Sequence, residues 1–119
     1  MKNLVLLIFF LFCFGDPLSG KSIQVPEHHK TIQAAINAAD SGDVIVVAAG
    51  TYNERIVLKP RIIVRSADKK EKGKLGLARA ERTIIDGGNE ESHLPGVIMA
   101  EDATLDGFTV TRIGVYDAK

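Results

Sequence analysis

The chain has 119 residues, enough for one domain, and its 15 basic and 15 acidic residues give a formal net charge of zero. This balance excludes the strongly basic surface that is typical of DNA-binding and RNA-binding proteins, so we expect no nucleic-acid partner. The single cysteine excludes a disulfide bond within the chain.

The N-terminus has the pattern of a signal peptide. Lys2 precedes an uninterrupted apolar run over residues 4–14, and a Gly-Asp-Pro sequence ends that run. A membrane-spanning helix needs roughly 20 apolar residues, so we expect cleavage and no membrane span afterwards. The sequence therefore predicts a signal peptide at 1–20, a single domain at 21–119, and a secreted or periplasmic location.

The predicted domain is rich in isoleucine and valine and poor in aromatic residues. Four of the five phenylalanines, and the only cysteine, belong to the first 20 residues. Because β-branched side chains favour strands over helices, the remaining composition favours a fold rich in strands.

One segment has the pattern of an amphipathic helix. An alternating strand at residues 23–25 ends at Pro26, and Thr31 then stands where a helix N-cap is expected. Gly42 is predicted to stop the helix in a left-handed conformation. Between them, four apolar residues have the spacing of one helix face: Ile32, Ala35, Ile36 and Ala39.

After this helix, short apolar segments alternate with turns. Residues 44–47 are consecutive β-branched residues, so they predict a strand that is buried on both sides. The later segments are residues 56–58, 62–64, 83–85, 97–99, 105 and 108–110, with an inserted stretch at about 66–82.

These later segments also suggest an internal repeat. Three pairs match at an offset of roughly forty residues; without the insert this becomes a repeat of roughly 20–25 residues, typical of a solenoid. The matched pairs are Val46 with Ile84, Val57 with Ile98, and Ile63 with Leu105.

Four segments carry a recognisable pattern: TIQAAINAA at 31–39, GDVIVVAAGTYNERI at 42–56, TIIDGG at 83–88 and ATLDGFTVT at 103–111. Together they resemble the N-terminal end of right-handed parallel β-helix proteins of the pectin-lyase-like superfamily, with an opening similar to that of pectin methylesterases. The resemblance implies an all-β fold: a right-handed parallel β-helix (solenoid) of about two to three rungs with an N-terminal capping α-helix. Residues 21–119 would be the truncated N-terminal part of such a domain.

The resemblance carries no catalytic residue over to this chain. In esterases and lyases of this superfamily, the catalytic and calcium-binding residues lie on later rungs. PEHHK at residues 26–30 also replaces the family-like Asp-Gly-Ser-Gly. We therefore expect no catalytic, metal or cofactor site and no enzymatic activity of this chain by itself.

Three residues are candidates for ligand binding. Tyr52 and Glu54 stand in a turn that the resemblance places at a surface where sugars could stack, and Asp106 precedes a glycine turn. The preferred interpretation is structural: a packed ring, a solvated carboxylate, and aspartates such as Asp86 and Asp106 that bond nearby turn amides.

Other polar groups could bind a metal or perform acid-base catalysis, but ordinary loop and turn positions explain each of them better. His28 and His29 are the candidates for a metal site, and Glu90, Glu91 and His93 are the candidates for calcium binding. Glu101, Asp102 and Asp106 are the candidates for acid-base catalysis.

The leading functional hypothesis is an exported β-helix fragment that binds polysaccharide or forms part of a polysaccharide-processing protein. Self-association, or docking to missing downstream rungs, would then occur at its C-terminal end. One alternative is a small non-enzymatic structural or interaction module that oligomerises through this open end. Another is a periplasmic metal-related maturation factor of the β-helix type.

Overall fold

The computed structural model describes residues 20–67, 77–88 and 94–113. Residues 1–19 of the predicted signal peptide lie outside this part, as do Glu90, Glu91 and His93. The elements in chain order are β1 (Ser22–Val25), α2 (Ile32–Ala38), β2 (Val44–Val47), β3 (Gly50–Tyr52), β4 (Ile56–Val57), β5 (Ile63–Ser66), α3 (Ala78–Arg82), β6 (Thr83–Asp86), β7 (Val97–Ile98), β8 (Thr104–Asp106) and β9 (Thr109–Thr111).

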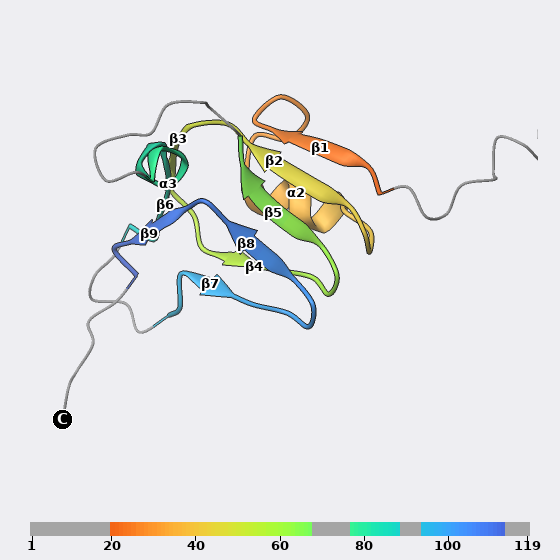
Figure 1. The fold of residues 1–119 in the computed structure, drawn as a ribbon. Helices are drawn as coiled ribbons and strands as arrows, with labels where there is room; N and C mark the ends of the chain where they lie inside the picture. The colour runs from red at the N-terminus through yellow and green to blue at the C-terminus, as the bar shows by residue number, and fades with distance from the viewer. Residues whose placement is uncertain (1–19, 68–76, 89–93, 114–119) are drawn as a thin grey trace, which may run out of the picture.

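The strands form three sheets, and every strand pair in the described part of the chain is parallel. The four-stranded sheet has the order β1-β2-β5-β8, the three-stranded sheet β3-β6-β9, and the two-stranded sheet β4-β7. In every sheet, the strand that comes last in the chain also lies at one edge. These edge strands are β7, β8 and β9, drawn in blue in Figure 1, and each lies below its partner there.

The four-stranded sheet directs one set of side chains into the core. Its register places Ile45 beside Val64, and both side chains are completely buried. Val44 and Val46 point to the opposite face and are only half-buried. The predicted burial of residues 44–47 on both sides is therefore wrong, because the core fully covers only one face of the sheet.

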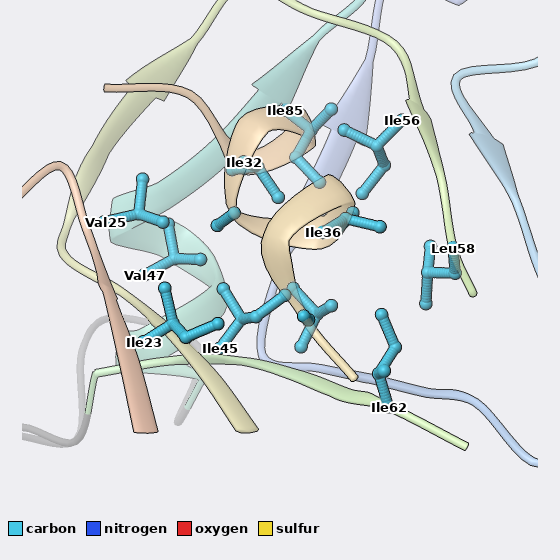
Figure 2. Packing of buried hydrophobic residues seen from close by; sticks show 13 residues of the cluster. Ile23, Val25, Ile32, Ile36, Ile45, Val47, Ile56, Leu58, Ile62 and Ile85 are labelled. Carbon is cyan, nitrogen blue, oxygen red and sulfur yellow. The ribbon is translucent and has the colours of Figure 1, made fainter. Parts of the chain in front are cut away.

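Helix α2 contributes to the same core as the strands. Its apolar residues Ile32, Ala35 and Ile36 are completely buried. Figure 2 shows Ile32 and Ile36 among side chains from β1, β2, β4 and β6. The predicted apolar face of the helix is thus confirmed.

The two ends of α2 differ in how well the sequence predicts them. Thr31 caps the helix, and its Oγ1 accepts a hydrogen bond from Ala34 N at 3.1 Å, as predicted. The helix ends at Ala38, and Gly42 lies in the turn that follows, with φ of +92°. The left-handed conformation of Gly42 is confirmed, but its role as the helix stop is not.

The predicted fold class is wrong. In place of an all-β right-handed parallel β-helix (solenoid) of two to three rungs, the structure is a small α/β domain with parallel sheets. Helices account for 15% of the described residues and strands for 36%. Helix α2 shares one hydrophobic cluster with the strands, and a second helix, α3, follows β5. Short β-branched segments between glycine turns are common to many parallel-sheet domains, so their spacing alone did not identify the architecture.

One of the three predicted repeat pairs is confirmed, because Val57 pairs with Ile98 in register. The match of Ile63 with Leu105 is displaced by one residue, because Ile63 pairs with Thr104. The third match is wrong, since Val46 and Ile84 lie in different sheets.

Helix α3 lies at the end of the segment that was predicted to be an insert. It has five residues, and α2 has seven. In the described ranges, neither helix combines the length and the apolar character needed to cross a membrane.

Candidate functional site

Strands β7, β8 and β9 each pair on one side only within the described residues, and we call these three strands the open edge. Their paired sides are identified by backbone hydrogen bonds. Thr104 N donates to the Ile62 carbonyl at 3.0 Å. Leu58 N donates to the Ile98 carbonyl at 2.9 Å, and Gly87 N donates to the Thr111 carbonyl, also at 2.9 Å.

The free side of the open edge presents the backbone groups of Val97, Leu105 and Val110. Alternate residues of a parallel strand direct their N–H and C=O groups to opposite neighbours. These three residues adjoin the ones that bond inward, so their own groups face away from the sheets. They could therefore pair with an additional strand.

Side chains become less buried where the sheets reach the open edge. Residues in register across neighbouring strands form rows of side chains. In one row Leu105 follows Ile45 and Val64, and in another Val110 follows Ile85. Ile45, Val64 and Ile85 are completely buried, whereas Leu105 and Val110 are half-buried, as is Tyr52 at the other end of the second row. One more layer of side chains would complete the burial of these rows.

Apolar residues also surround the open edge, and Asp106 is the one charged residue within its strands. Its strands contain no lysine and no proline, the residues with which native proteins discourage pairing at sheet edges. Large apolar side chains in or next to these strands are 36 to 63% exposed: Leu94, Ile98, Met99 and Ile113.

The outer edge of β4 is closed by a side chain from α2. Gln33 Oε1 accepts a hydrogen bond from Val57 N at 2.8 Å, and Gln33 Nε2 donates to the Val57 carbonyl at 3.2 Å. The side-chain amide therefore occupies the place that a neighbouring strand's peptide group would take.

At the outer edge of β1, the histidine turn that follows the strand bonds the backbone groups of Gln24. Gln24 N donates to His28 Nδ1 at 2.9 Å, and the Gln24 carbonyl accepts hydrogen bonds from the backbone N–H groups of His28 and His29. The histidine pair, interpreted from the sequence as a loop without metal, thus has a structural role at this edge.

Glu54, one of the predicted ligand-binding residues, holds the N-terminus of α2. Its carboxylate accepts hydrogen bonds from Ile32 N at 3.0 Å and from Gln33 N at 2.9 Å. At the other end, Lys59 Nζ donates to the carbonyls of Asn37 and Ala39. Both contacts place opposite charge at the helix ends, which stabilises the helix.

Tyr52, the second predicted ligand-binding residue, packs against the hydrophobic core. Its hydroxyl donates a hydrogen bond to the Ala48 carbonyl at 2.7 Å. Burial raises the pKa of the phenol, and the nearby charge of Glu54 raises this pKa further. The ring therefore has the packed environment of the structural interpretation.

Asp106, the third predicted ligand-binding residue, anchors α3 to the open edge. Its Oδ2 lies 2.8 Å from Arg79 Nη2, and Arg79 Nε donates to Ser66 Oγ at 3.2 Å. Thr109 Oγ1 donates to the Ala80 carbonyl and adds a second contact to α3. The three predicted ligand-binding residues therefore do not form one site. Tyr52 and Glu54 lie close together in the chain, whereas Asp106 is bonded to Arg79 of α3.

The remaining polar groups form no metal centre in the part of the chain that the structure describes. Glu101 and Asp102 are exposed in the turn before β8. Asp86 accepts a hydrogen bond from Gly88 N at 2.8 Å, as predicted for an aspartate in this turn. The predicted calcium candidates lie outside the described residues.

Replacing Glu54 with alanine is expected to lower the free energy of unfolding by about 1–2 kcal/mol, because it leaves two helix N–H groups without their acceptor. Urea denaturation measures this change. Glu27→Ala removes an exposed glutamate elsewhere and should cost less than about 0.5 kcal/mol. Equal stability of the two variants would contradict the anchoring role of Glu54.

Sequence reasoning missed Gln33 and Lys59, although both hold α2 in place. Their partners lie 20 to 24 residues away in the chain. Local spacing therefore provides no signal for either contact.

No protein-family model, curated protein or solved structure matches the chain. The resemblance to the pectin-lyase-like superfamily therefore stays a prediction.

Proposed function

We propose that the protein is a non-enzymatic interaction module that binds another polypeptide by strand addition at the open edge. The observation that carries this proposal is the loss of burial along the rows that end at Leu105 and Val110. An added strand would cover these side chains and bond the outward backbone groups in one step.

The contrast between the two sides of the domain supports the same proposal. The Gln33 side chain satisfies the outward backbone groups of Val57 in β4, and the His28 side chain accepts a hydrogen bond from Gln24 N in β1. Among the described residues, no comparable side chain covers Leu105 or Val110. Polysaccharide binding, export and a role in metal-related maturation stay predictions, and Tyr52, Glu54 and Asp106 all have internal partners.

Peptides that copy the chain's own strands test strand addition. The probes are residues 21–26, 43–49 and 61–66, each added at about 1 mM to the full chain. Amide hydrogen exchange, followed by NMR, is expected to slow about tenfold or more at Leu105 with at least one peptide. If no peptide slows exchange at Val97, Leu105 or Val110, the proposal is wrong.

A pair of threonine variants locates the binding edge. Thr104→Lys adds a protective lysine to β8, and Thr51→Lys adds one to β3, at a threonine that is also exposed. We expect Thr104→Lys to weaken peptide binding and Thr51→Lys to leave it unchanged. The reverse result would move the binding site to β3 and overturn the proposal.

A further inference from the structure

The open edge and the strand segment next to it carry opposite charge. Residues 97–113 contain the acids Glu101, Asp102 and Asp106 and the single base Arg112. Residues 55–66 lie alongside through the β4-β7 and β5-β8 pairs, and they contain four bases and no acid. The basic residues of that segment are Arg55, Lys59, Arg61 and Arg65.

The register brings these charges close together. Arg65 pairs with Asp106 across β5 and β8, and Arg61 N donates to the Glu101 carbonyl at 3.0 Å. Glu101 thus lies beside Arg61, and Asp106 lies beside Arg65. A strand added on the free side of β8 would run past the same acids.

Two of the charges at the open edge are available to a partner. Asp106 is paired with Arg79 at 2.8 Å, and Arg112 lies 3.4 Å from Asp86. Glu101 and Asp102 are exposed, and within the described residues neither carboxylate is paired with a base. The charge left over next to Leu105 is therefore negative.

We infer that the occupant of the open edge is a different polypeptide whose added strand carries a basic residue where it passes Glu101 and Asp102, as the neighbouring segment carries Arg61 beside Glu101. This inference rests on the proposed strand addition. A basic side chain at that position would approach Glu101 and Asp102 while the strand backbone bonds Leu105.

A second copy of the chain fits less well. If two open edges met, Glu101 and Asp102 would enter the interface twice, so four carboxylates would come together with Arg61 of each copy as the neighbouring base. In a head-to-tail contact with β1 or β4, the open edge would meet Gln24 and Val57, whose outward backbone groups are already bonded to the histidine turn and to Gln33.

Three peptides based on residues 61–66 separate charge from strand addition. The probes are RIIVRS, its neutral form QIIVQS and its charge-reversed form EIIVES, titrated into the full chain by calorimetry. We expect RIIVRS to bind about five- to tenfold more tightly than QIIVQS, and EIIVES to bind most weakly. The advantage of RIIVRS should shrink as the salt concentration rises from about 0.05 to 0.5 M.

Variants of the acidic turn assign the effect to its residues. Glu101→Gln combined with Asp102→Asn should remove the advantage of RIIVRS; asparagine tolerates the φ of +55° at position 102. The control Glu27→Gln changes an exposed glutamate in the turn after β1 and should retain the advantage. Thermal unfolding of both variants checks that the fold is intact.

The possible outcomes separate this inference from the proposed function. Equal binding of RIIVRS and QIIVQS would overturn the basic partner and retain strand addition. Failure of every strand peptide would overturn both. Sedimentation as a dimer, with Leu105 protected from exchange in the absence of peptide, would show that a second copy occupies the edge and would also overturn the inference.

Discussion

Replacing Ile36 with alanine is expected to lower the free energy of unfolding by about 3–4 kcal/mol. Ile36 is completely buried on α2, in one cluster with side chains from β1, β2, β4 and β6 (Figure 2). The substitution removes apolar contacts and leaves a cavity that close-packed neighbours fill only in part. In a small domain this is a large part of the total stability.

Ile63→Ala is the matched control for this prediction. Ile63 lies in β5 and is 39% exposed, so the same change should cost about 1 kcal/mol or less. Urea denaturation followed by circular dichroism measures both variants. A similar loss for the two would mean that α2 is not part of the core, in conflict with the α/β description.

Replacing Asp43 with asparagine is expected to lower the free energy of unfolding by about 2–3 kcal/mol at neutral pH. The Asp43 side chain is buried, and its two oxygens accept hydrogen bonds from Asp40 N and Lys21 N, both at 2.8 Å. Asparagine can accept only one of these bonds, because its NH₂ group would face the other N–H donor. The carboxylate joins the turn after α2 to the segment that leads into β1.

The loss in Asp43→Asn should depend on pH in a defined direction. The Asp40 and Lys21 N–H groups, in that order, lower the pKa of Asp43. The group therefore stabilises the fold above the unfolded pKa of about 3.9, and that contribution disappears as the pH falls through the lower folded value. The stability difference between wild type and variant should be largest near neutral pH and shrink in acid.

Asp40→Asn is the control for the pH dependence. The Asp40 side chain is 81% exposed and lies 3.6 Å from Lys21 Nζ. A surface pair of this kind contributes little, so the variant should lose less than about 0.5 kcal/mol and follow the wild-type pH profile. A difference between wild type and Asp43→Asn that stays constant down to about pH 2 would contradict the role of the ionised carboxylate.

Local sequence patterns predicted individual elements better than the architecture. The Thr31 cap and the apolar face of α2 are confirmed because both depend on residues a few positions apart. Helix α3 was not predicted, since its charged residues were assigned to a surface insert. The fold class was wrong because periodicity identifies short strands and does not show how sheets and helices share a core.

The candidate site was still harder to predict, because its contacts join distant parts of the chain. Tyr52 and Glu54 were identified as turn residues, but the helix amides that Glu54 binds are 21 and 22 residues away. The open edge has no motif of its own. Leu105 looks like any strand residue in sequence, and only the register shows that its row ends there.

The side-chain amide of Gln33 gives the domain a direction. By standing in for a strand at β4, it ends the β4-β7 sheet on that side, while β7 on the other side can still act as a template. An assembly built by adding strands to this sheet would therefore grow from β7 only, with the domain as its fixed starting point. Its length would be set by the incoming partner, because the Val57 backbone groups are already bonded to Gln33.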